Sequence, residues 1–148
     1  MANYSCAIRT NYFHVKDEEK FRDLMGRAYG SEDSISLWEE KDPEGKPVFA
    51  FGVYGGIGGI MNAQEDETED EDLDETSYDE FIDGLQECVA DDDAIIIFES
   101  GHEKLRYVIG DALVITGAGH WYMDIAALAT EKAAEMLGNP GWKTKCTY

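Results

Sequence analysis

Apolar and polar positions alternate at the start of the chain and then change to a helical spacing. Residues 4–15 are rich in aromatic and β-branched side chains, which predicts a strand. Asp17 can cap a helix after this strand, because a carboxylate accepts hydrogen bonds from the free N–H groups of a first helical turn. We expect the helix to end near Gly30, with one buried face formed by Phe21, Leu24, Met25 and Ala28.

Two further apolar segments are typical of a β-hairpin. Residues 34–40 and 47–54 flank the turn-forming sequence Asp42-Pro43-Glu44-Gly45. The glycine-rich stretch 55–59 comes next and contains neither common phosphate-binding pattern. We expect a flexible turn there, since glycine adopts positive φ without steric cost.

A second amphipathic helix is predicted beyond an acidic stretch. Residues 64–76 consist largely of Asp and Glu, with Leu73 as the one large apolar residue. We expect this stretch to be a mobile segment outside the core, because it cannot bury enough apolar surface to offset the entropy of ordering it. The helix after it has an apolar face formed by Tyr78, Phe81, Ile82, Leu85 and Val89.

The C-terminal third is predicted to contain three strands and a third helix. Apolar segments at 94–99, 104–109 and 112–116 indicate the strands, with turns at Gly101 and at Gly110-Asp111. The helix that follows is rich in alanine, and its expected boundaries are a cap at Asp124, a last residue at Leu137, and stop signals at Gly138 and Pro140.

The predicted element order is β-α-β-β-α-β-β-β-α, within one domain that spans residues 1–148. Hairpins between helices favour an α+β fold, an antiparallel sheet with helices on one face. The first six elements have the ferredoxin-like order β-α-β-β-α-β, which a hairpin and a C-terminal helix then extend.

Negative charge is concentrated in the middle of the chain. The 148 residues include 32 acids and 12 bases, for a net charge of −20. Residues 1–46 carry 10 acids and 7 bases, and residues 104–148 carry 4 acids and 5 bases. Residues 47–103 carry 18 acids and no Lys or Arg. Such a charge favours cationic partners and disfavours direct binding to nucleic acid or to an anionic membrane.

The cysteines and the N-terminus predict a cytoplasmic protein. Cys6, Cys88 and Cys146 are odd in number and widely spaced, so free thiols in a reducing compartment explain them more simply than redox chemistry or metal binding. The first residues lack the basic and apolar regions of an export signal. No apolar run reaches the roughly 18 residues of a membrane span.

No motif in the sequence predicts a catalytic residue, a metal site or a cofactor. The acidic stretch lacks the glycine and the final glutamate of an EF-hand loop, whether the loop starts at Asp66 or at Asp70. The three histidines are not spaced as metal ligands, and no hydrolase or kinase signature occurs. Scattered acids such as Glu99 and Asp111 could serve acid–base chemistry, but their spacing does not identify a pair.

The second helix carries the most informative local pattern. Asp79, Asp83 and Glu87 follow one another at intervals of four residues, opposite the apolar face. Like charges at this spacing destabilise a helix by a few tenths of a kcal/mol per pair, roughly. The stripe is either a solvated face or an anionic surface for a basic partner. In the second case we expect the partner-binding residues to be Asp79, Asp83, Glu87, Asp91, Asp92 and Asp93.

A DNA mimic would be one form of such a surface. Duplex DNA carries one negative charge per roughly 1.7 Å of its axis. A helical stripe with one charge in four residues carries one per roughly 6 Å. The stripe alone is therefore too sparse, and a mimic would also need the acidic stretch or the Asp91–Asp93 turn beside it.

Four stretches together resemble small acidic accessory proteins carried by the mobile genetic elements of gut bacteria. They are Asn3-Tyr4-Ser5-Cys6, Arg9-Thr10-Asn11-Tyr12-Phe13, Trp38-Glu39-Glu40-Lys41-Asp42 and Leu137-Gly138-Asn139-Pro140. The resemblance implies a bacterial cytoplasm. It also implies a setting in which acidic antirestriction and anti-CRISPR proteins block DNA-binding enzymes. It assigns no functional residue.

The sequence therefore favours a non-enzymatic acidic binding protein that presents an anionic face to a basic protein partner. One such partner is a nucleic-acid-binding enzyme that a DNA mimic would inhibit. A small enzyme without a recognisable motif and a structural or assembly subunit are the alternatives. A convergent polar pocket would favour the enzyme, and a continuous anionic face would favour the binding protein.

The charge pattern predicts that monovalent salt stabilises the protein. Screening weakens the repulsion among the acids of residues 47–103, so the melting temperature should rise with added NaCl. Calcium at matched ionic strength should add little. A large, saturable stabilisation by micromolar calcium would contradict this prediction and indicate a specific calcium site.

Overall fold

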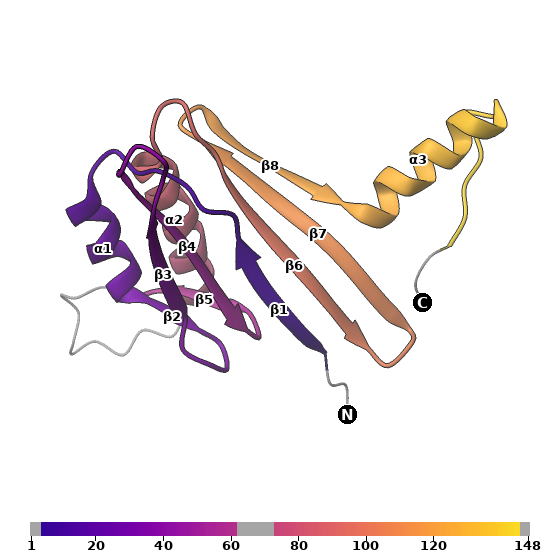
Figure 1. Cartoon of the computed structure of the whole chain (residues 1–148). Coiled ribbons are helices and arrows are strands. Elements are labelled where there is room, and N and C mark those ends of the chain that lie inside the picture. The colour runs from indigo at the N-terminus through magenta and orange to yellow at the C-terminus, as the bar shows by residue number, and fades with distance from the viewer. Residues whose placement is uncertain (1–3, 62–72, 146–148) are drawn as a thin grey trace.

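The structure is a computed structural model that describes residues 4–61 and 73–145. These residues form an α+β fold of eight strands and three helices, shown in Figure 1. In chain order the elements are β1 (Ser5–Thr10), α1 (Glu18–Arg27), β2 (Ala28–Gly30), β3 (Ser36–Lys41), β4 (Pro47–Tyr54), β5 (Ile57–Ile60), α2 (Leu73–Cys88), β6 (Ile95–Glu103), β7 (Tyr107–Thr116), β8 (Gly119–Asp124) and α3 (Ile125–Leu137).

Six strands form the main sheet in the order β3-β4-β1-β6-β7-β8, and every neighbouring pair is antiparallel. The predicted α+β class with an antiparallel sheet is therefore confirmed. Helices α1 and α2 lie on one face, which we call the inner face, and their apolar sides join the core (Figure 1). We call the opposite face of the sheet the outer face.

Phenylalanine rings dominate the core between the sheet and the two helices. The cluster contains rings from the segment after β1, from α1, from β4 and from α2, and all of them are fully buried: Phe13, Phe21, Phe49, Phe51 and Phe81. Several contacts are edge-on, including Phe13 on Phe21, with ring centroids 5.6 Å apart. Such pairs add roughly 0.5–1.5 kcal/mol to the burial of their surface.

Two short strands replace the predicted end of the first helix and part of the predicted glycine turn. Strand β2 directly follows α1 and pairs with β5, which includes part of the predicted glycine turn. Gly58 lies in β5 because the Tyr29 ring fills the space that a side chain there would need. The helix predicted to run to Gly30 ends at Arg27 instead. These insertions change the chain order, so the predicted ferredoxin-like order is not confirmed.

The C-terminal strands are longer than predicted and are displaced along the sequence. The segments predicted as 94–99, 104–109 and 112–116 are two strands, β6 and β7, and the turn between them lies at 104–106. Gly101 and Gly110, predicted as turn residues, lie within these strands. A side chain on Gly101 would collide with the Tyr4 hydroxyl, which explains glycine in a strand. Strand β8, rich in aromatic residues, was not predicted.

Helix α3 begins without a loop after β8. Asp124 is the last residue of β8 and also the N-cap of α3, where its carboxylate accepts a hydrogen bond from the Ala126 amide at 3.4 Å. Gly138 ends the helix in the left-handed conformation at φ 65°. Both predicted caps are confirmed. No residue of α3 belongs to the core cluster, and Figure 1 shows the helix leaving the sheet.

The last part of the predicted mobile segment 64–76 is helical. Residues 73–76 belong to this helix, and the rest of the segment lies outside the described residues. A helix accommodates acidic sequence in its first turn because the free N–H groups there carry partial positive charge.

The fully buried Phe51 ring, which contacts both Phe13 and Phe81, should be among the most sensitive positions of the core. We expect Phe51→Ala to lower the free energy of unfolding by about 3–5 kcal/mol, because it leaves a cavity between sheet and helices. Urea denaturation of the variant measures this loss. Phe98→Ala, at a half-exposed ring on the outer face, is the control and should cost less than about 1 kcal/mol.

Candidate functional site

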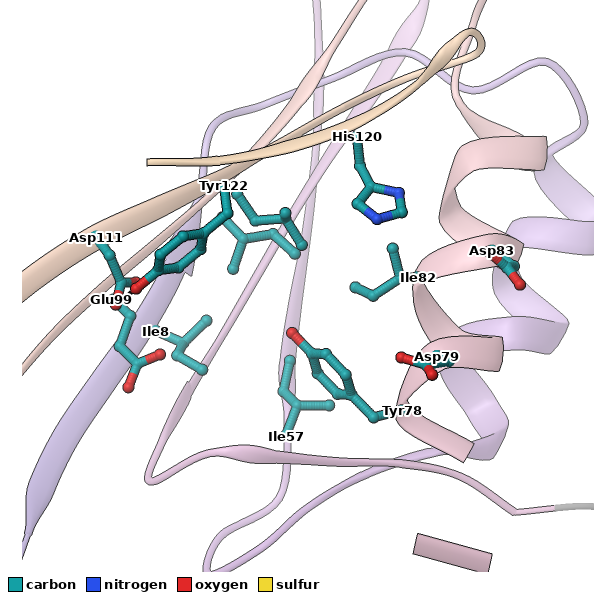
Figure 2. Close-up of a pocket in the computed structure, with 12 residues that line it drawn as sticks. Ile8, Ile57, Tyr78, Asp79, Ile82, Asp83, Glu99, Asp111, His120 and Tyr122 are labelled. Atoms are coloured by element: carbon teal, nitrogen blue, oxygen red, sulfur yellow. Dashed lines mark hydrogen bonds between the residues drawn. The ribbon is translucent and has the colours of Figure 1, made fainter. Parts of the chain in front are cut away.

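A pocket opens on the inner face where the sheet extends past α2. It has a volume of about 630 Å³ and lies between α2 on one side and strands β6, β7 and β8 on the other. Figure 2 shows Tyr78 and Ile82 pointing from α2 into this space, with His120 above them and Tyr122 opposite. Isoleucine and leucine side chains form its floor: Ile8, Ile57, Ile97 and Leu113.

Two carboxylates face each other across neighbouring strands in this pocket. Glu99 on β6 is the direct cross-strand partner of Asp111 on β7. Asp111 is in turn opposite Asp124 on β8, so three acids form a row across the sheet. Like charges at such positions destabilise a sheet, since their Cβ atoms lie only about 5 Å apart. No Lys or Arg is among the described residues that line the pocket.

Tyrosine hydroxyls donate hydrogen bonds to both of these carboxylates. Tyr4 donates to Glu99 at 3.0 Å, and Tyr122 donates to Asp111 at 2.9 Å. A neutral donor orients a carboxylate without cancelling its charge. Glu99 and Asp111 therefore keep their negative charge, and the second lone pairs of these oxygens stay available to a ligand.

The neighbouring titratable groups respond to this negative charge. Burial, together with the Asp111 and Glu99 carboxylates, raises the pKa of Tyr122 to about 12. Burial and Glu99 likewise raise the pKa of the Cys6 thiol to about 11. The pKa values of Tyr4 and Tyr78 are raised for the same two reasons. All four groups are held in their neutral forms, because another negative charge beside Glu99 and Asp111 is unfavourable.

The pocket thus combines an apolar floor, two aromatic walls and uncompensated carboxylates. A ligand that fits this combination has a positive charge and an apolar body. Lysine and arginine side chains have this form, since a methylene stem carries a charged head. Tyrosine faces also attract cations through their ring quadrupole.

The residues predicted from the sequence divide into two groups in the structure. Asp79 and Asp83 line the pocket at its α2 rim (Figure 2), and Glu87 is exposed farther along the same helix. Asp91 is exposed and forms an ion pair with Lys16 at 3.4 Å, while Asp92 borders a different hollow. Only the first two predicted residues therefore lie at the acidic pocket.

Asp93 is held by the protein itself. Its carboxylate accepts hydrogen bonds from the His14 backbone N–H and interacts with the His14 ring Nδ1, both at 2.8 Å. The opposite ring nitrogen, Nε2, lies 2.8 Å from Asp42 in the β3–β4 turn. His14 thus connects the segment after β1, the β3–β4 hairpin and the turn after α2. Asp93 is half-buried in this contact, whereas Asp91 and Asp92 are exposed.

The pocket residues that sequence reasoning missed come from β6, β7 and β8. Glu99 and Asp111 were noted without a reason to pair them, because the predicted turn at Gly110-Asp111 placed Asp111 outside any strand. A turn centred on Leu105 puts the two acids opposite each other, and Lys104 with its positive φ of 52° marks that turn. The aromatic content of residues 119–124 was an available but unused signal for β8.

The comparisons with known proteins return no relatives. No family model matches the chain, and no curated protein or solved structure is significantly similar to it. Within residues 4–61 and 73–145, His, Cys, Asp and Glu side chains nowhere gather in a group of three or more that could hold a metal ion. The described helices include none long and apolar enough to cross a membrane. Among the described cysteines, Cys6 and Cys88 are free thiols.

The His14 contacts predict that stability depends on pH. Hydrogen bonds to Asp42 and Asp93 raise the pKa of His14. The stabilisation of the folded state by protonated His14 is therefore complete below about pH 6.5, and it is lost as pH rises through the higher pKa of the folded state. The bond to His14 lowers the pKa of Asp42, and hydrogen bonds from His14 lower that of Asp93 despite its burial. The stabilisation of the folded state by the ionised Asp42 and Asp93 carboxylates is complete above about pH 4 and is lost as pH falls below it.

We therefore expect His14→Gln to lower the melting temperature most between about pH 4 and about pH 6.5, with a smaller loss at higher pH. Melting curves of wild type and variant across this range test the expectation. Other charged side chains surround the hollow beside His14 and are the same in the wild type and the variant: Lys16, Glu18, Glu44, Lys46 and Asp92. His102→Gln, at an exposed histidine, is the control. A His14→Gln loss that is constant with pH would show that the ring only fills space.

Proposed function

We propose that this chain is a non-enzymatic binding protein whose acidic pocket receives a Lys or Arg side chain of a basic protein partner. The observation that carries the proposal is the direct pairing of Glu99 with Asp111 above an apolar floor, with no Lys or Arg among the described lining residues. Such a like-charge pair destabilises the sheet that contains it, so the pair does not serve the stability of the fold. A cationic head group between the two carboxylates would relieve their repulsion.

The shape of the pocket supports a basic side chain over a bare ion. The apolar stem of a lysine or arginine would cover the isoleucines of the floor, and the head group would reach the Glu99 and Asp111 oxygens. Arginine fits especially well, because its planar guanidinium can bond two carboxylates and stack on a tyrosine ring. The net charge of −20 would accelerate the encounter with a basic surface.

The wider acidic surface supports a partner that normally binds nucleic acid. The row Glu99-Asp111-Asp124 places one acid per strand, at a spacing of about 5 Å. The Asp79-Asp83-Glu87 stripe carries one acid per roughly 6 Å, and its first two members, Asp79 and Asp83, line the same pocket. Two such rows come closer to the charge density of duplex DNA than the stripe alone. Together with the resemblance to mobile-element proteins, this favours a DNA mimic that acts on a nucleic-acid-binding enzyme in a bacterial cytoplasm.

The pocket also gives the enzyme alternative a specific basis. Two carboxylates that face one space can act as acid and base on a bound small molecule. We favour binding, because an apolar floor below two carboxylates that tyrosine hydroxyls orient suits recognition of a cation with an apolar stem. A structural or assembly subunit, the remaining alternative, would not need the pocket.

Neutralising the carboxylate pair should abolish most cation binding. We expect Glu99→Gln with Asp111→Asn to raise the Kd for a fluorescent oligo-arginine peptide by about tenfold or more. Folding should be preserved, because both amides still accept the tyrosine hydrogen bonds and the like-charge repulsion is gone. Fluorescence anisotropy at low and at physiological salt measures the change. Asp79→Asn, Asp83→Asn and Glu87→Gln together should slow association and reduce its salt dependence.

A matched control separates the pocket from overall charge. Glu19→Gln with Asp33→Asn removes the same two charges from exposed positions away from the pocket. If this control weakens binding as much as the pocket variant does, the peptide responds only to net charge and the proposed site is wrong. Equal affinity and equal salt dependence for the Asp79, Asp83 and Glu87 variant would reduce the stripe to a solvated helix face.

A further inference from the structure

The main sheet ends in two edge strands of different composition. Strand β3, at one margin, carries three charged residues in succession: Glu39, Glu40 and Lys41. Arg22 of α1 also binds the Glu39 carboxylate at 2.6 Å. Charged residues on an edge strand discourage another chain from pairing with it. The β3 edge is therefore protected against strand addition.

Strand β8, at the other margin, lacks this protection. Residues 119–124 contain neither Lys nor Pro, and their one acid, Asp124, comes last. The strand pairs with β7 in regular register over all six residues, without a bulge. Among the described residues no strand pairs with its far side, and Figure 1 shows β8 along the margin of the sheet. Such an edge presents unpaired N–H and C=O groups, which are a template for an added strand.

Helix α3 follows β8 directly and does not cover this edge. Because Asp124 both ends β8 and caps α3, no loop residue separates the strand from the helix. Ile125, the first residue of α3, contacts β7 at Gly110 on the outer face. Figure 1 shows the helix continuing beyond the end of β8 instead of folding back along it.

The acidic row of the pocket reaches this open edge. Glu99, Asp111 and Asp124 are successive cross-strand partners on β6, β7 and β8. A strand added to β8 would lie about 4.8 Å from it and would place one residue in register with Asp124. The Ala126 amide bonds one Asp124 oxygen, so this carboxylate retains acceptor capacity for a ligand.

Charge selects a basic strand as the occupant of the edge. A second copy of this chain would bring a further net charge of −20 to the acidic row and would be repelled. An Arg or Lys in register with Asp124 would instead continue the row with the opposite charge, which stabilises a cross-strand pair. Such a side chain is also long enough to extend past Asp124 toward Asp111, because neighbouring strands lie so close together.

We propose that the basic partner binds by adding an extended strand to β8. In this strand Arg or Lys alternates with apolar residues. The basic side chains lie on the inner face, beside Asp124 and toward the acidic pocket, and the apolar ones lie beside Trp121 and Met123 on the outer face. The inference rests on the proposed function. To the side-chain recognition in the pocket it adds main-chain hydrogen bonds, which supply affinity in this mode of binding.

A short peptide that alternates Arg and Val tests strand addition. In an extended strand, alternate residues direct their N–H groups to the same neighbour. N-methylation of either all Arg or all Val amides therefore blocks one edge of the peptide and keeps every charge. We expect one methylated peptide to bind with a Kd raised about tenfold or more, because it loses several hydrogen bonds to β8. The other should bind about as the unmodified peptide does. Fluorescence anisotropy with the full chain measures all three.

Hydrogen exchange locates the added strand on the protein. The unmodified peptide should slow the exchange of those β8 amides that point away from β7, because they gain main-chain acceptors. The amides of the β3 edge are the internal control and should exchange at an unchanged rate. Asp124→Asn, which keeps a good N-cap for α3, should raise the peptide Kd about threefold or more. Glu19→Gln removes one charge from an exposed position and should leave the Kd nearly unchanged.

The outcomes separate strand addition from the pocket itself. Equal Kd values for the two methylated peptides, or β8 amides that the peptide does not protect, would overturn strand addition even where Glu99→Gln with Asp111→Asn still weakens binding. A wild type that sediments as a dimer through β8 would assign the edge to a second copy and would also overturn it. If the Glu99 and Asp111 variant binds the unmodified peptide as the wild type does, the proposed function fails, and the methylated pair still decides strand addition.

Discussion

Contact among five buried phenylalanines holds this fold together against its own charge. The rings come from four separate segments and meet between the sheet and the two inner-face helices, with the Phe21 and Phe49 centroids 4.9 Å apart. A chain of net charge −20 resists compaction, and burial of this aromatic surface opposes the repulsion. Asp79, Asp83 and Glu87 of the central block are accordingly exposed on α2, outside this core. Phe81 also fixes α2 against the sheet, which sets the position of one wall of the acidic pocket.

The sheet is wider than the two helices that cover it. Apolar side chains of α1 and α2 share the core with β4, β1, β6 and the end of β7 at Ile115, while β8 contributes nothing to the core cluster. Beyond the edge of α2 the inner face is open, and the acidic row is exposed to ligands there. The outer face of the same strands is apolar and poor in acids. One extension of the sheet thus provides two surfaces of opposite character, an acidic one on the inner face and an apolar one on the outer face.

Acidic residues of this protein serve different purposes, which composition cannot distinguish. Asp17 and Asp124 cap helices, and Asp42 and Asp93 hold the His14 ring. These carboxylates are satisfied within the chain. Glu99 and Asp111 accept hydrogen bonds from neutral tyrosine hydroxyls and keep their charge, as described for the pocket. The carboxylates that remain available to a cation are therefore a small and localised part of the total.

Local sequence determined the α+β class, the helix caps at Asp17, Asp124 and Gly138, and the apolar faces of α1 and α2, because capping and periodicity depend on neighbours within a few residues. The sequence misplaced the C-terminal turns, because glycine occurs both in turns and in strands where another side chain approaches the backbone closely. Gly101 and Gly110 are of the strand type. Only the positions of the Tyr4 and Ile125 side chains in the folded chain show this. The stripe on α2 was visible as a spacing of four. The pairing of Glu99 with Asp111 was not, because a one-residue change of turn moves every side chain to the other face or to another partner. Cross-strand register is a property of the assembled sheet, and so the acidic pocket was decided by tertiary structure alone.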